Sequence, residues 1–159
     1  MPDLIGRHKR LSFLKVDQTY TRMTKFTSLN ESKSPKEYTR QYVDRSGEDT
    51  DVVGYSASVA FAYDRHTDTP VHDKLADIID NEKMGTDAHV DIVTVDLFKK
   101  TETNACEARM RTYSVIPSNV GDGTDALIYS GNLKAVSEMV TGTAASEDNW
   151  ETCTFTPKE

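Results

Sequence analysis

The densest group of metal-capable side chains in the sequence lies within ten residues. It contains two histidines and three aspartates: Asp64, His66, Asp68, His72 and Asp73. Imidazole and carboxylate groups bind several divalent transition metals, so one hypothesis is a metal-dependent enzyme that uses His66 and His72. The alternative is a polar turn before a helix, where aspartate is favoured near the helix start. The spacing matches no established metal motif, which favours the turn.

Other patterns that could support chemistry are weaker. Residues 121–125 (GDGTD) combine glycine and aspartate as calcium and phosphate loops do, but the required Glu and Lys are missing, which favours a hairpin tip. Cys106 and Cys153 lie in no nucleophile motif and are too few for a disulfide framework, so we interpret both as free thiols. The carboxylates are abundant but scattered. We therefore expect no enzymatic activity, no cofactor and no bound metal.

Most of the chain shows the alternation with period two that is typical of half-buried strands. The run 89–98 has apolar residues on both phases, which predicts a central strand covered on both faces. Pro117 is expected to end the strand before it, residues 118–125 to form a hairpin turn, and Gly131 to mark a bulge or bend. Strands are predicted over residues 11–16, 20–29, 53–63, 89–98, 107–116, 127–139 and 150–156.

One helix is predicted between these strands. Thr69 is a suitable N-cap and Pro70 suits the first helical position. The helix should end near Lys83, with Gly85 as the stop. The stripe that would face the core consists of Val71, Leu75, Ile78 and Ile79.

Residues 30–50 show no sustained period. About twenty residues is long for a loop in a compact domain, and such loops are usually functional or disordered. Tyr38, Tyr42 and Val43 give this segment apolar surface to bury. We therefore expect a projecting loop that becomes ordered against a neighbouring molecule.

The formal net charge of −7 conceals an asymmetry along the chain. Residues 1–45 contain ten basic and five acidic side chains, whereas residues 46–159 contain nine basic and twenty-one acidic ones. The two parts either attract the opposite parts of other copies or neutralise each other within one fold. Nucleic-acid binding through the basic part is a weaker alternative, since the bases are spread singly.

The sequence shows neither the pattern of a membrane-spanning segment nor that of a secretory signal. No apolar run approaches the roughly 20 residues that span a bilayer, so we expect no membrane association. The first ten residues lack the apolar stretch of a secretory signal, which favours folding in a reducing cytoplasm.

Six short segments, in this order and spacing, resemble major tail proteins (tail tube proteins) of tailed phages that infect Gram-positive bacteria. They are PKEYTRQYVD (35–44), TDVVGYS (50–56), HDKLAD (72–77), DNE (80–82), GTDA (85–88) and YSGNLKAV (129–136). The resemblance covers most of residues 30–156. It implies a structural virion protein, assembled in the host cytoplasm, that forms hexameric rings stacked into the hollow tail tube through which phage DNA is delivered. It also implies contacts with tape measure, tail terminator and distal tail proteins.

The fold that this resemblance implies is mainly β (α+β), a β-sandwich or partial barrel with one flanking helix. We expect residues 1–159 to form a single domain, with residues 30–50 as a projecting inter-subunit loop. DNA would pass an acidic lumen without specific binding, and we place acidic residues of the 107–139 hairpin near it. The main alternative is a tube-initiating or tail-completion protein of the same fold. The candidate interface residues are Lys33, Lys36, Tyr38, Arg40, Tyr42, Arg45, Glu48 and Asp49.

Overall fold

The computed structural model describes residues 2–102, 104–121 and 124–158. These residues form mainly β-structure, with one α-helix, α1 (Pro70–Asp80), and two short 3-10 turns, η1 (Arg7–Lys9) and η2 (Gly85–Ala88). The strands are β1 (Arg10–Val16), β2 (Thr19–Arg22), β3 (Phe26–Ser32), β4 (Pro35–Gln41), β5 (Glu48–Tyr55), β6 (Ser58–Asp64), β7 (His89–Glu102), β8 (Ala105–Val120), β9 (Ile128–Ala135), β10 (Val140–Ala145) and β11 (Thr152–Pro157).

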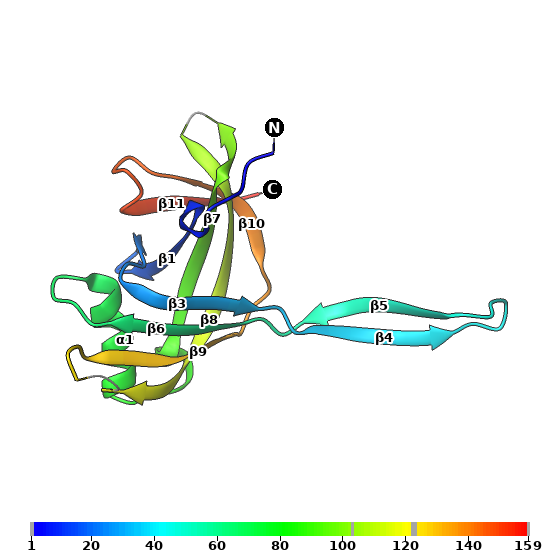
Figure 1. Ribbon diagram of the computed structural model, residues 1–159, viewed down its shortest axis with the longest axis horizontal. Helices are drawn as coiled ribbons and strands as arrows, with labels where there is room; N and C mark the ends of the chain where they lie inside the picture. Colours follow the sequence, from blue (N-terminus) through cyan, green and yellow to red (C-terminus); the bar gives the residue numbers. More distant parts are fainter. Residues whose placement is uncertain (1, 103, 122–123, 159) are drawn as a thin grey trace.

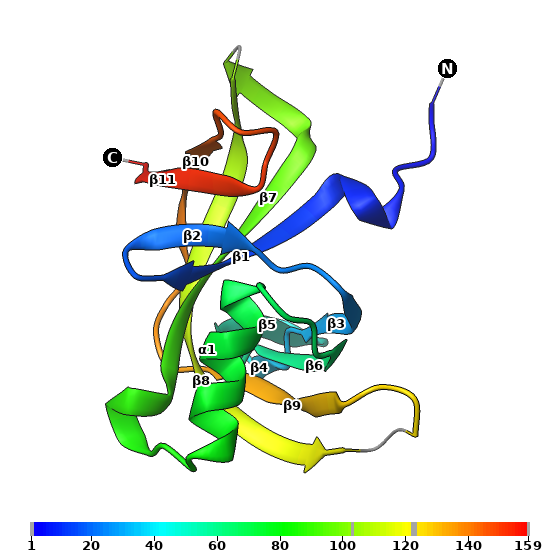
Figure 2. The same cartoon turned by 90° about the vertical axis from the view of Figure 1, so that its left-hand side faces the viewer.

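Six antiparallel strands close into a barrel. Around it, β1 pairs with β7, β7 with β8, β8 with β10, β10 with β11, β11 with β2, and β2 again with β1. Figure 2 shows this ring of strands at the upper part of the molecule. The expected β-sandwich or partial barrel is therefore confirmed as a closed barrel with a flanking sheet.

The long strand β8 joins the barrel to the flanking sheet. Residues 105–110 of β8 pair with β10, whereas residues 113–120 pair with β9 along the same edge. The sheet then continues through β6 to β3. Helix α1 lies beside this part of the molecule (Figure 2) and contacts β1, β2 and β8.

Two apolar cores lie on opposite faces of β7. Val93 and Val95 pack in the barrel with Phe13, whereas Val90 and Ile92 pack in the core beneath α1. These two cores explain the apolar residues on both phases of the 89–98 run. The predicted central strand is confirmed, since β7 has β1 and β8 as neighbours.

Two predicted strands are each divided in two, and a third ends early. The run 53–63 is split at residues 56–57, where the chain passes from β5 in one sheet to β6 in another. The run 20–29 forms β2 and β3, separated by a turn in which Lys25 has a positive φ of 62°. The run 127–139 ends as a strand at Ala135, and the separate strand β10, which the sequence analysis did not predict, begins at Val140.

The prediction that Pro117 ends its strand is wrong. Strand β8 continues to Val120, and its register with β9 shifts between Pro117 and Asn119. A bulge tolerates proline because the ladder is already interrupted there. The irregularity therefore lies opposite Gly131, not at it: Gly131 pairs regularly with Phe61 of β6. The predicted pairing of the 107–116 and 127–139 runs is confirmed, whereas Asp122 and Gly123 of the connecting turn lie outside the described residues.

The helix begins as predicted and ends slightly earlier. Pro70 is its first residue and Thr69 its N-cap, but the Thr69 hydroxyl donates to the Thr67 carbonyl and leaves the helix backbone uncapped. The helix ends at Asp80, three residues before the predicted end, and Glu82 has a positive φ of 49°. No helix in the described ranges is long and apolar enough to cross a membrane.

Candidate interaction surface

His72, one of the two histidines of the metal hypothesis, is fully buried on α1. Its Nε2 donates to the Thr24 carbonyl at 2.8 Å, and its Nδ1 accepts from the backbone N–H of His66 at 3.0 Å. Its ring stacks on Tyr63 with 4.5 Å between centroids. Burial lowers the pKa of His72, which favours the neutral ring that this hydrogen-bond pattern requires. Both ring nitrogens are therefore already used by the backbone.

Two other members of that group, His66 and Asp73, also have local partners. The His66 ring contacts the Asp64 carbonyl at 2.6 Å, and Asp73 accepts a hydrogen bond from Arg65 at 3.3 Å. Within the described ranges, no three or more His, Cys, Asp or Glu side chains are placed to hold a metal ion. The arrangement favours the polar strand-to-helix turn over a metal centre.

The segment that was expected to be an irregular loop is a long β-hairpin. We define the arm as residues 33–56, which comprise β4, β5 and their connecting turn (Figure 1). Strands β4 and β5 pair only with each other, in a two-stranded sheet separate from the main one. The arm projects from the main sheet in Figure 1, whereas the irregular conformation predicted for residues 30–50 is wrong, since residues 30–32 belong to β3 and most of the others to the hairpin. Both of its faces are solvated, so no buried face imposes an apolar period on the sequence.

The arm exposes much of the molecule's apolar surface. Every side chain of β4 is exposed, and β5 is exposed except for two partly covered residues. Of the fifteen large apolar side chains exposed in the described ranges, six belong to the arm: Tyr38, Tyr42, Val43, Val52, Val53 and Tyr55. Concentrated exposed apolar surface indicates a site of interaction with another protein.

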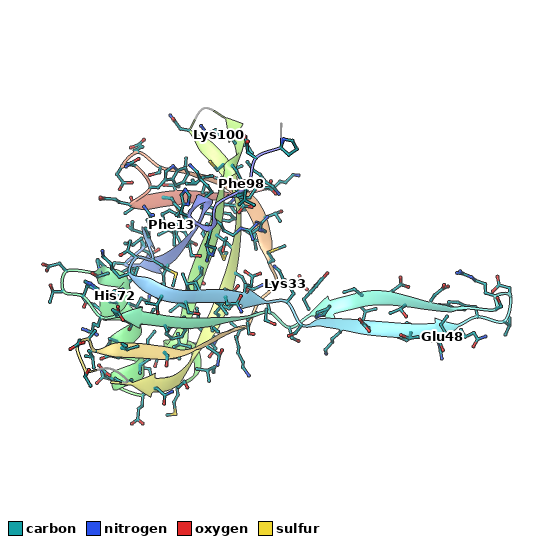
Figure 3. The ribbon with its side chains drawn as sticks, viewed as in Figure 1. Phe13, Lys33, Glu48, His72, Phe98 and Lys100 are labelled. Atoms are coloured by element: carbon teal, nitrogen blue, oxygen red, sulfur yellow. The ribbon has the colours of Figure 1, made fainter. Side chains whose placement is uncertain are left out.

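The arm also carries charges of both signs. Arg45 and Asp49 form an ion pair across the turn at 2.6 Å, and the Arg40 guanidinium lies over the Tyr38 ring at 5.6 Å. In Figure 3, Lys33 lies where the arm leaves the body and Glu48 lies near its far end. The structure thus places all eight predicted interface residues on one element, and their role at an interface stays a prediction.

The division of charge at residue 45 does not produce two separate surfaces. It falls in the turn of the arm, and the three main-sheet strands of residues 1–45, which are β1, β2 and β3, pair with strands of residues 46–159 in the same sheet. Arg10 of the basic part pairs with the buried Asp96 of the acidic part at 2.7 Å, and Arg109 pairs with it at 2.5 Å. Burial alone would raise the pKa of Asp96, but these two guanidinium groups outweigh it and lower that pKa. Part of the asymmetry is therefore neutralised within one fold.

A basic side chain in the 107–139 hairpin, such as Arg109, argues against an acidic lumen near that hairpin. Its pairing with Asp96 removes that particular objection, and the position of a lumen stays a prediction. A cleft beside Lys33, which contains Arg10, Arg109 and Arg111, was not predicted from the sequence. Because these residues come from β1, from β8 and from the root of the arm, only the alternate arginines of β8 gave a signal that could have revealed it.

No protein-family profile and no curated sequence matches the chain. Among solved structures, the chain resembles a chain from the six-fold symmetrised cryo-EM structure of the anti-feeding prophage (AFP) baseplate. The TM-score is 0.50 at 10% identity, and the match covers 89% of this chain and 97% of that one. A chain of the PVC sheath–tube complex, from an extracellular contractile injection system in the extended state, has a TM-score of 0.46 at 14% identity, covering 90% and 93%. At this identity the AFP likeness shows a shared fold.

Proposed function

We propose that this protein is a structural subunit of a phage-tail-like particle that self-assembles into hexameric rings, stacked as the hollow tube through which phage DNA is delivered. The observation that carries the proposal is the arm. A two-stranded hairpin is at best marginally stable by itself in water. This one exposes both faces and six large apolar side chains, so a partner surface would stabilise it.

The fold shared with the AFP chain supports a phage-tail-like particle. The AFP chain comes from a baseplate solved with six-fold symmetry, and nearly the whole of that chain aligns with this one. A projecting arm and the body that receives it are different surfaces, so their contact is heterologous, and heterologous contacts close into rings or extend as filaments. A stacked tube combines the two outcomes, because one contact closes each ring and another repeats from ring to ring along the tube.

The same proposal includes the kind of phage, the location of the protein and its partners. The six short segments support a major tail protein of a phage that infects Gram-positive bacteria, assembled in the host cytoplasm and located in the virion tail. Its partners would be further copies of itself and tape measure, tail terminator and distal tail proteins. DNA would pass through the lumen without specific binding. We propose no enzymatic role.

A second candidate is a tube-initiating or tail-completion protein of the same fold. The observation that favours it is that the AFP neighbour belongs to a baseplate. The two candidates differ in how far assembly proceeds, because a tube subunit polymerises whereas an initiator stops at one ring.

Negative-stain electron microscopy of the concentrated protein tests the proposal, with an arm-deleted variant as the matched control. Ser34 and Ser56 lie at the base of the arm, where the Ser56 N–H donates to the Ser34 carbonyl at 3.1 Å. Residues 35–55 can therefore be replaced by Gly-Gly with little disturbance of the body. We expect rings and tubes from the complete chain, and a folded monomer from the variant.

Each possible result has a distinct meaning. Single rings without tubes would favour the initiator. A complete chain that stays monomeric at all concentrations and salt conditions would argue against both candidates. An arm-deleted variant that assembles like the complete chain would remove the arm from the interface.

A further inference from the structure

We infer that a basic cleft at the root of the arm receives the acidic tip of the arm of another copy. The basic cleft is defined by Arg10, Lys33, Arg109 and Arg111, and has a volume of about 340 Å³. The tip is residues 41–51. This inference rests on the proposed self-assembly and specifies which two surfaces meet.

The cleft has unused capacity for acidic groups. Glu31 is the single acidic residue among its lining residues, and it pairs with Lys33. Arg10 and Arg109 share the buried Asp96. Arg111 has no ion-pair partner within the described ranges, and its buried Nε has no hydrogen-bond partner there. The unpaired charge of the Arg111 guanidinium, which lines the cleft, would attract an incoming carboxylate.

The tip complements the cleft in charge and in apolar surface. It contains four acidic residues, Asp44, Glu48, Asp49 and Asp51, and one basic residue, Arg45. Val43 is fully exposed at its end. The cleft offers apolar contact as well, because Met139, which is also exposed, lines it. The acidic side chains and Val43 of the tip therefore complement the arginines and Met139 of the cleft.

A tip cannot reach the cleft of its own copy. Lys33 and Glu48 lie at opposite ends of the arm in Figure 3. Seven strand residues at about 3.4 Å each separate root and tip by roughly 24 Å. The contact must therefore join two copies, and because each copy has one tip and one cleft, it can repeat without limit or close into a ring.

Cysteine cross-linking tests the contact directly. Both native cysteines are buried, so a variant with Val43→Cys and Met139→Cys presents one new thiol at the tip and one at the cleft. Under mild oxidation we expect a ladder of covalent dimers, trimers and longer chains on a non-reducing gel. The matched control pairs Val43→Cys with Met84→Cys, an exposed methionine outside the cleft, and should give tip-to-tip dimers at most.

A charge exchange provides the second test. Lys33→Glu with Arg111→Glu reverses the cleft, and Glu48→Lys with Asp51→Lys reverses the tip. Each reversal alone should lower assembly at least tenfold while circular dichroism stays native, and the protein with all four changes should recover assembly. Recovery separates a specific contact from a general loss of stability.

Several results would overturn the inference. If wild-type rings or tubes form but no ladder appears, or if both cysteine pairs give equal ladders, the receiving surface is elsewhere and the proposed function stands. If reversal of the cleft abolishes binding of a 20-nucleotide DNA probe but leaves assembly intact, the cleft binds nucleic acid instead. If neither assembly nor a ladder occurs at any concentration, both the inference and the proposed function fail.

Discussion

Replacing His72 separates its hydrogen bonds from its packing. In His72→Phe the ring still stacks on Tyr63, but the Thr24 carbonyl and the His66 N–H lose their partner. Both bonds are only part-buried, so each unpaired backbone group should cost about 1 kcal/mol, and at pH 7.5 we expect the free energy of unfolding to fall by roughly 2 kcal/mol. His72→Ala also leaves a cavity in a closely packed core and should be less stable than His72→Phe.

The pH dependence of stability gives the sharper test. Burial lowers the pKa of His72 in the folded protein, so below about pH 6.5 the unfolded chain binds a proton that the folded one excludes. The stabilisation is present above the unfolded pKa, begins to be lost as the pH falls below that value, and is lost completely once the pH falls through the lower pKa of the folded protein. Between pH 7.5 and 5.5, one such group lowers the free energy of unfolding by at most about 1.4 kcal/mol. The wild type should lose this amount and His72→Phe should not.

Urea denaturation at pH 7.5, 6.5 and 5.5 measures both effects. The stability difference between wild type and His72→Phe should narrow as the pH falls. His8→Gln, in the exposed turn η1, is the control and should retain the wild-type slope. If the curves of wild type and His72→Phe stay parallel, the neutral buried histidine is the wrong explanation. Bound metal in the purified wild type that is lost in His72→Phe would refute the hydrogen-bond assignment altogether.

Three other perturbations test particular contacts. Gly131→Ala would place a Cβ 2.5 Å from the Ile116 carbonyl oxygen and should lower the free energy of unfolding by about 1–3 kcal/mol, whereas Gly47→Ala, which meets nothing within 4 Å, should be nearly neutral in the same thermal melts. Asp96→Ala removes the partner of Arg10 and Arg109 and should lower the free energy of unfolding by about 3 kcal/mol at pH 7. Because the pKa of Asp96 is lowered, the stability difference between wild type and variant should narrow below about pH 4. A stability difference that stays constant down to pH 2 would contradict the ion pairs. Burial raises the pKa of Cys153 to about 12, so neither Cys153 nor the buried Cys106 should react with a thiol reagent at pH 8 until urea unfolds the protein, and rapid labelling of the native protein would be inconsistent with this packing.

The elements that the sequence predicted best are those whose burial is asymmetric or complete. Helix α1 has one apolar stripe, and its buried residues include all four predicted ones. Strand β7 was recognisable because both of its faces are covered by apolar cores. In each case the local pattern reflects contacts that the segment makes along its whole length.

The features that the sequence did not predict depend on distant parts of the chain or on no burial at all. The cleft brings together Arg10 of β1, Arg111 of β8 and Lys33 at the root of the arm, and no spacing along the chain indicates that these residues meet. The arm has no buried face, so its strands have no apolar alternation. The net charges of residues 1–45 and 46–159 did not locate any charged surface. The acidic tip and the basic cleft each contain residues from both of these parts of the chain.

The closed barrel restricts how copies can associate. Closing a sheet removes its edges, so the barrel offers no complete strand edge for pairing with another molecule. Among the described residues, β3 is the one strand of the nine-stranded sheet with a single neighbour, and the two strands of the arm have open outer edges. Lys33, at the base of the arm, directly follows β3 and lines the basic cleft. The open edge, the cleft and the root of the arm therefore lie together, and a neighbouring copy that docks there can contact all three at once.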